Sequence, residues 1–204
     1  MTIEKKLLGT SPSGGATDVA DVFSTDLYDG NDSSQTINNG IDLAGEGGMV
    51  WQKLRVHPQP PDGQDHYLRD TVRGGGRRVY SNKTNGQNEG DGGISSFNSN
   101  GFSIGNISAG NLNGAKYVSW TFRKAKKFFD IVTFTANGSS NQTISHNLGS
   151  VPAMIMTKKT NGSNNWYTYH KGLNNGTNPQ QYWIELDGNG RGQGPNANFW
   201  NNTA

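Results

Sequence analysis

The chain has 204 residues, of which only 31% are apolar, and a formal net charge of +2 at neutral pH. It has no cysteine, so the sequence excludes a disulfide framework and a thiolate metal site. The charge excess is too small to indicate nucleic-acid binding, and no apolar run approaches the roughly 18 residues of a membrane span. Many aromatic residues, few aliphatic runs and frequent Gly and Asn together favour an all-β protein.

Residues 1–22 read as a leader that cannot build a core of its own. Ile3, Leu7 and Leu8 flank charged residues in a short patch that is compatible with a helix, and a Gly- and Ser-containing loop follows. We interpret residues 1–22 as an attachment segment that docks on a larger assembly. The three apolar side chains are its predicted contact residues.

The remaining sequence reads as two copies of one unit. The order of the matching segments is preserved, and their spacing drifts only as loop lengths would make it drift. The matches pair QTI at 35–37 with QTI at 142–144, MVWQK at 49–53 with MIMTK at 154–158, HYLRD at 66–70 with WYTYH at 166–170, and SSFNSN at 95–100 with NFWNN at 198–202. A tandem duplication explains this order better than chance does.

Each unit is predicted to consist of short antiparallel strands. QTI predicts a short extended segment. The apolar triplets MVW and MIM predict strands that are buried on both faces or lie at a sandwich core. The run KYVSWTF at 116–122 alternates Tyr117, Ser119 and Thr121 with a second set of Val118, Trp120 and Phe122, as a strand with two distinct faces does. We therefore predict an antiparallel β-sandwich of jelly-roll type in each unit.

The predicted boundaries are 23–122 for the first sandwich, 123–128 for a basic linker and 129–204 for the second sandwich. The first unit closes with KYVSWTF, and the sequence of the second unit contains no counterpart of this strand. A missing core strand would leave an open sheet edge. We expect either that the chain is a fragment of a longer protein, which we favour, or that another chain supplies the strand.

No residue pattern indicates catalysis. The histidines at positions 57, 66, 146 and 170 lack the spacing of a zinc helix, and there is no nucleophile elbow, phosphate loop or dinucleotide motif. Acidic turns such as DGND at 29–32 lack the distal glutamate of a calcium loop. We therefore expect no enzyme activity, no metal and no cofactor.

Aromatic residues of the second unit are the remaining candidates for a binding surface. The candidates are Trp166, Tyr167, Tyr169, Tyr182 and Trp183, which would stack on sugar rings if they were exposed. In a chain this poor in aliphatic residues, a place in the core is the favoured alternative for them.

Several segments together carry a resemblance to a known family. They are DVADVFSTDLYDG at 18–30, GMVWQK at 48–53, DTVRG at 70–74, SFNSNGF at 96–102, YVSWTF at 117–122 and HNLGSVP at 146–152. This set, which covers nearly the whole chain from Asp18 to Ala204, resembles a family of virion proteins from tailed phages, common among marine phages and those of cyanobacteria. Members carry tandem copies of this unit, and their second unit extends further than this chain.

The resemblance implies a virion structural protein, in the tail rather than on the capsid surface. Its implied role is that of a tail fibre or fibre-like appendage, a homo-oligomer and most simply a homotrimer, which contacts other virion proteins. Host attachment would use a surface receptor and a C-terminal region beyond this chain. A capsid-surface decoration or head-fibre protein and a carbohydrate-binding module are the alternatives. No nucleic acid, membrane insertion or active-site residue is implied.

Overall fold

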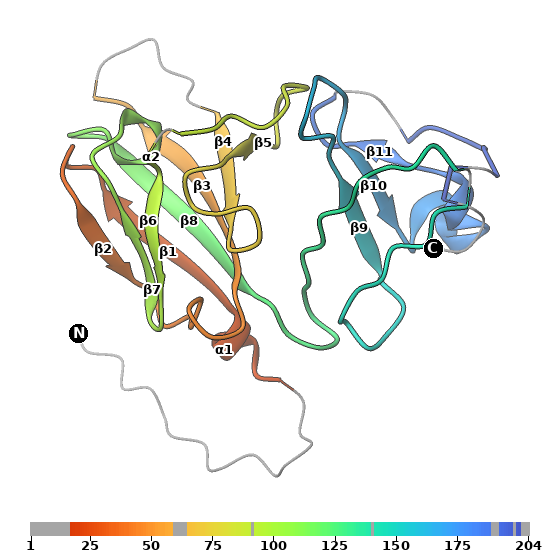
Figure 1. Cartoon of the computed structure of the whole chain (residues 1–204), viewed down its shortest axis with the longest axis horizontal. Helices are drawn as coiled ribbons and strands as arrows, with labels where there is room; N and C mark the ends of the chain where they lie inside the picture. The colour runs from red at the N-terminus through yellow and green to blue at the C-terminus, as the bar shows by residue number, and fades with distance from the viewer. Residues whose placement is uncertain are drawn as a thin grey trace.

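The computed structural model describes residues 17–58, 65–90, 92–139, 141–188, 192–197 and 199–200. It confirms the all-β prediction, with 35% of residues in strands and 9% in helices. Figure 1 shows two lobes, with β1 to β8 in one and β9 to β11 in the other. The proposed attachment residues Ile3, Leu7 and Leu8 lie outside the described residues.

The first lobe holds the strands β1 (Phe23–Asp29), β2 (Gln35–Asn38), β3 (Gly48–Val56), β4 (His66–Asp70), β5 (Val79–Tyr80), β6 (Ile94–Asn98), β7 (Gly101–Ile104) and β8 (Lys116–Arg123), with the one-turn helices α1 (Val19–Val22) and α2 (Ser108–Asn111). The second lobe holds β9 (Met154–Thr157), β10 (Tyr167–His170) and β11 (Ile184–Glu185), with the 3-10 turns η1 (Leu173–Gly176) and η2 (Pro179–Gln181). Val22, which we assigned to the leader, is only 1% exposed and so packs as part of the first lobe.

The first lobe is an antiparallel sandwich of two sheets. One sheet has the order β1-β8-β3-β4-β5 and the other the order β2-β7-β6. The core that the lobe buries comprises Tyr28, Ile37, Ile41, Leu43, Val50, Leu54, Ile94, Phe102, Ala115 and Tyr117. These side chains come from both sheets and from the loop after β2, because alternate residues of a strand face the same side.

Strand β8 lies inside the larger sheet, between β1 and β3. It pairs antiparallel with β1 on one side and β3 on the other, so that Phe122 lies opposite both Phe23 and Met49. The two predicted faces are correct, but the face of Tyr117, Ser119 and Thr121 is the fully buried one. A hydroxyl tolerates this position when it is hydrogen-bonded, and the hydroxyl of Thr121 accepts a bond from the side-chain amide of Asn39 at 2.8 Å.

The three strands of the second lobe repeat the register of β3, β4 and β5. Met49 lies opposite Asp70 in the first lobe, and Met154 lies opposite His170 in the second. The next pairing agrees as well, because β4 meets β5 at the positions where β10 meets β11. The shared register over three strands supports the interpretation of the sequence as a repeat.

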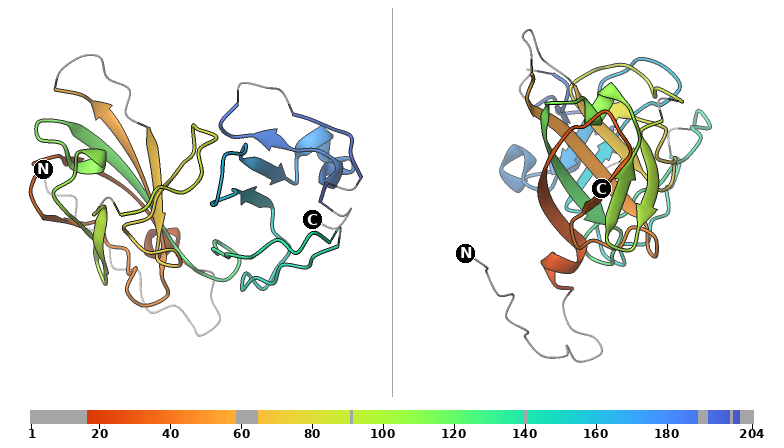
Figure 2. Two further views of the ribbon diagram at one scale, coloured as in Figure 1. Left: turned by 45° about the horizontal axis from the view of Figure 1, so that its top comes forward. Right: turned by 90° about the vertical axis from the view of Figure 1, so that its left-hand side faces the viewer.

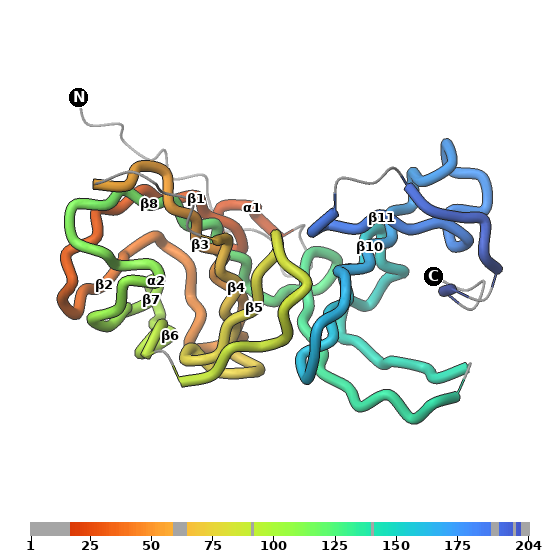
Figure 3. Tube along the Cα trace, turned by 90° about the horizontal axis from the view of Figure 1, so that it is seen from above, coloured from red at the N-terminus to blue at the C-terminus, as the bar shows by residue number. Residues whose placement is uncertain are grey.

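The repeat does not extend to the first strands of the second unit. We predicted an extended strand-like segment for QTI at 142–144, and the structure assigns no strand there. In the first lobe, β7 pairs with β2 and β8 pairs with β1, and the described residues of the second lobe include no counterpart of either partner. Residues 130–139 and 141–150 form no strand, and in Figure 3 they extend away from β10 and β11.

The larger sheet of the first lobe packs against the second lobe, which lies beside it in Figure 2. The buried residues at this interface are Met49, Leu68 and Val79 of the first lobe and Trp166 of the second, surrounded by the partly buried Trp51, Phe122, Phe129, Ile131, Met156 and Leu186. Val50 faces the sandwich core while its neighbours Met49 and Trp51 face the second lobe. The prediction that MVW is covered on both faces is therefore confirmed. The same prediction for MIM is wrong, because Met154 is 51% exposed and Ile155 and Met156 are only partly buried in a strand that pairs on one side.

A buried arginine crosses the sandwich core. The guanidinium of Arg69 donates hydrogen bonds to the side-chain oxygen of Gln52 at 2.7 Å and to the carbonyl of Ala109 at 3.3 Å. Gln52 in turn donates to the hydroxyl of Tyr28 at 2.8 Å. Burial lowers the pKa of Arg69 to about 10, so the side chain remains charged at neutral pH.

Candidate functional site

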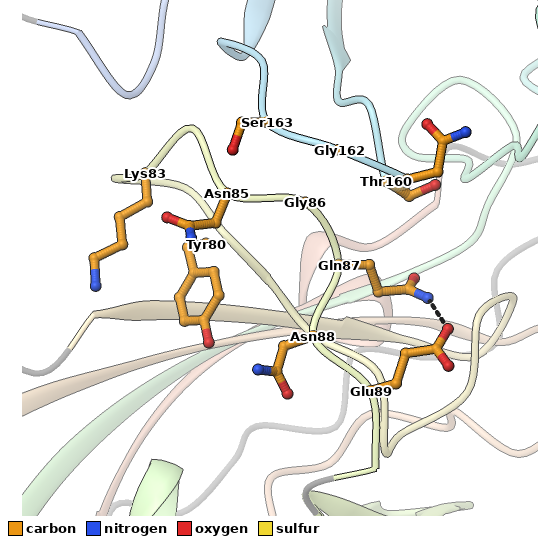
Figure 4. A pocket seen from close by; sticks show the side chains of 11 residues that line it. Tyr80, Lys83, Asn85, Gly86, Gln87, Asn88, Glu89, Thr160, Gly162 and Ser163 are labelled. Atoms are coloured by element: carbon orange, nitrogen blue, oxygen red, sulfur yellow. Dashed lines mark hydrogen bonds between the residues drawn. The ribbon is translucent and has the colours of Figure 1, made fainter.

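A polar cleft opens where the lobes meet (Figure 4). The loop after β5 supplies one wall, and the loop between β9 and β10 supplies the other. The cleft has a volume of about 620 Å³ and is lined by Tyr80, Lys83, Asn85, Gly86, Gln87, Asn88, Glu89, Thr160, Asn161, Gly162 and Ser163. Both loops are rich in Asn and Gly, residues that favour turns over strands.

Backbone hydrogen bonds hold the two walls together. The amide of Gln87 donates to the carbonyl of Thr160 at 2.7 Å, and the amide of Asn164 donates to the carbonyl of Thr84 at 2.9 Å. Between these bonds, a Cβ on Gly86 would lie only 2.7 Å from the carbonyl oxygen of Thr160, so the close approach requires glycine. The cleft therefore has fixed walls rather than two independent loops.

Lys158 also joins the same two loops through hydrogen bonds. Its ammonium donates to the carbonyls of Asn164 and Thr84, the latter at 2.7 Å. Burial lowers the pKa of Lys158, and the nearby carboxylate of Asp187 partly opposes this effect. The indole of Trp166 lies beside this ammonium, 6.0 Å from ring centre to nitrogen, and donates to the carbonyl of Tyr80 at 2.6 Å.

The lining combines amide groups with one aromatic ring. Asn85, Gln87 and Asn88 offer both donors and acceptors, and the ring of Tyr80 lies beside them. The amide of Gln87 donates to Glu89 at 2.9 Å, as the dashed line in Figure 4 marks. Such amides can hydrogen-bond to a polyhydroxyl ligand, whereas the Tyr80 side chain is only 9% exposed and offers little surface for stacking.

The described lining of the cleft contains one carboxyl group. Glycoside hydrolysis ordinarily needs two carboxyl groups on either side of the scissile bond. Among the described residues that line the cleft, Glu89 alone carries a carboxylate, and it interacts with Gln87 and with Arg77 at 3.4 Å.

The aromatic residues that we proposed as ligand-facing are not in the cleft. Trp166 and Tyr169 are 5% and 4% exposed, so these two lie in packed positions, which agrees with the favoured alternative of a place in the core. Tyr167 and Trp183 are half-buried around Phe199, at ring distances of 5.1 and 4.1 Å. Phe199 stacks on one face of the Trp183 indole and so covers that face.

The cleft residues escaped sequence reasoning because their only local signal is an Asn-Gly turn in each loop, at Asn85 and Asn161. Such turns are common in this chain and carry no sign of function. Only the packing of the two lobes brings the loops together.

The histidines do not form a metal centre. Within the part of the chain that the structure describes, no three His, Asp or Glu side chains lie close enough to hold a metal ion. His66 has a structural contact instead, since its Nδ1 accepts a hydrogen bond from the indole of Trp51 at 2.9 Å. Burial and the charge of Lys53 lower the pKa of His66, which favours the neutral ring that this bond requires.

Comparison with known proteins assigns a family. The model of a domain of unknown function, DUF7483, matches residues 18–204 and so spans both lobes. The chain belongs to the DUF7483 family. No curated protein and no solved structure is detectably similar to it. Among the described residues, no helix has the length and apolar character to cross a membrane.

Proposed function

We propose that this chain is a structural protein of a tailed-phage virion and forms part of a tail fibre or fibre-like appendage. The observation that carries the proposal is the fixed packing of two β-units against each other. Trp166 is buried between the lobes, and backbone bonds join their loops. An appendage that bears mechanical load needs such a junction, because flexible linkers alone would let the units swing.

The sequence resemblance supports the virion assignment. Within this proposal the chain contacts other virion proteins and assembles as a homo-oligomer. Threefold packing would give parallel chains a shared interface and raise their avidity for a host surface.

Electron microscopy of intact particles tests the location. Gold-labelled antibodies raised against residues 23–122 would be applied to particles of a phage that encodes the chain, with antibody pre-absorbed on purified protein as the control. Label at the tail is the expected result. Label spread over the head would support a capsid decoration or head-fibre protein, and no label on any particle would refute the virion assignment.

A carbohydrate-binding role is a second candidate, and the polar cleft is the observation that favours it. Binding of oligosaccharides to the purified chain would be screened on a glycan array and measured by calorimetry. Asn85→Ala removes a lining amide and is expected to weaken binding, whereas Asn106→Ala changes an exposed amide elsewhere on the first lobe and is expected to have no effect. Equal effects of the two variants would place the sugar outside the cleft.

A further inference from the structure

The outer edge of β9 is unpaired within the described residues. β3 has β4 on one side and β8 on the other, whereas its counterpart β9 has only β10. Edges of this kind expose a row of backbone donors and acceptors, which serve as a template for another strand.

One apolar side chain on this edge is exposed. Met49 is 7% exposed in β3, but the corresponding Met154 is 51% exposed in β9. Elsewhere in the same lobe, Val132, Phe134 and Val151 are 41%, 53% and 78% exposed. Burial of a side chain of this size is favourable, so the exposure of Met154 on an unpaired edge indicates a surface that a partner covers.

The second lobe also has almost no core of its own. Beyond Thr121, the described residues that are buried are Trp166, Thr168 and Tyr169. Trp166 is buried against the first lobe rather than within the second. A sheet of three short strands needs a further packing partner for independent stability.

The backbone geometry shows which groups a partner would meet. The amide of Lys171 donates to the carbonyl of Ala153 at 2.9 Å, which continues the β9–β10 ladder. Hydrogen bonds of an antiparallel strand alternate between its two sides. Ile155 and Thr157 therefore direct their N–H and C=O groups toward β10, and those of Met154 and Met156 point to the outer edge.

We propose that the outer edge of β9 binds an antiparallel strand that has the residue pattern of β8. In the first lobe, β8 fills this place and sets Phe122 opposite Met49 and Trp120 opposite Trp51. The same register places large apolar side chains of the bound strand opposite Met154 and Met156, and a small hydroxyl residue opposite Ile155.

The occupant is a segment of about eight residues, as β8 is, that belongs to another stretch of polypeptide. A second copy of β9 fits less well. It has four residues, half the length of the eight-residue β8 that fills this place in the first lobe. The proposal does not depend on the virion assignment.

Peptide binding tests the proposal. A fluorescein-labelled peptide with the sequence of residues 115–124, which contains β8, would be titrated with the purified chain and followed by fluorescence anisotropy. Saturable binding and a higher melting temperature of the chain are expected, because a ligand specific for the folded state stabilises it. The control peptide carries Ser119→Pro, which breaks the strand. Absence of saturable binding, or equal binding of both peptides, would overturn the proposal.

Variants at Met154 test the outer edge. Met154→Pro removes an outward N–H at the first residue of β9, where proline is tolerated, and Met154→Thr keeps this group as a matched control. The proline variant is expected to bind the peptide about tenfold more weakly than the threonine variant, which is the effect of about one hydrogen bond. Equal affinities would exclude strand addition at this edge. If the chain forms a dimer that Met154→Pro dissociates but the peptide does not, the edge binds a second copy of the chain. This result would overturn the proposal.

Cross-linking tests the register. The chain has no cysteine, so Met154→Cys introduces a single thiol. A peptide with Phe122→Cys is expected to form a disulfide with it, whereas a peptide with Thr121→Cys faces the opposite side of the sheet and is not. Equal cross-linking of both peptides would rule out the β8 register.

Discussion

Replacing Trp166 with alanine is expected to uncouple the stability of the two lobes. The residue belongs to the second lobe but is only 5% exposed, because its indole packs with Met49, Leu68 and Val79 of the first. Its Nε1–H also donates a hydrogen bond to the carbonyl of Tyr80 at 2.6 Å. The indole is thus the main apolar anchor of the interface.

The expected cost follows from these contacts. Truncation of a buried tryptophan to alanine costs about 3–5 kcal/mol, and a lost hydrogen bond that leaves a buried carbonyl contributes about 1 kcal/mol within that range. The loss falls on the second lobe, whose other buried side chains among the described residues are those of Thr168 and Tyr169. The first lobe keeps its own core and is expected to keep its stability.

Urea unfolding with amide hydrogen exchange provides the assay. The wild-type chain is expected to unfold in one transition, with β10 and β4 protected to a similar degree. In the Trp166→Ala variant, β10 loses protection at lower urea than β4, and two transitions separate. Trp166→Phe is the control, because it keeps an aromatic ring in place and loses mainly the hydrogen bond, a cost of about 1–2 kcal/mol. A single transition at the wild-type midpoint in the alanine variant would refute the reasoning.

Three further predictions concern charge and close packing. Burial by itself raises the pKa of Asp130, but hydrogen bonds from two backbone amides and a lysine outweigh it and lower the pKa below its ordinary 3.8. The free energy of unfolding is therefore expected to fall as the pH drops below 3.8. Asp130→Asn should make the urea midpoint depend less on pH in this acid range, and an unchanged dependence would contradict this assignment. The pKa of His66 is lowered from 6.5, so the free energy of unfolding should decrease as the pH falls below that value and the hydrogen bond from Trp51 is lost. His66→Gln should remove this pH dependence. If the pH dependence persists in the variant, another group causes it. A Cβ on Gly93 would lie 2.2 Å from Nε of Arg69. Gly93→Ala should therefore lower the free energy of unfolding by about 2 kcal/mol. A urea midpoint equal to that of the wild type would mean that the guanidinium moves aside without cost.

The second unit shows how sequence and structure contribute different information. The sequence of this unit has no counterpart of KYVSWTF, and the structure shows that β9 pairs on one side only within the described residues. Met154 is half exposed where Met49 is buried, although both residues begin the same apolar triplet. Local pattern therefore identified the strand, while the neighbouring strands decided whether its side chains are covered.

The amino-acid sequence by itself determined the all-β class, the two faces of β8, the burial of MVW on both sides and the likeness of β3–β4 to β9–β10. These features depend on residues that are near in sequence, through the alternation of side chains along a strand. Only the tertiary structure decided that Trp166 is buried, that the Ser119 face of β8 points inward and that two Asn-Gly loops form a cleft. Each of these depends on which sheet faces pack together, and such contacts join residues that are distant in the sequence and leave no local pattern.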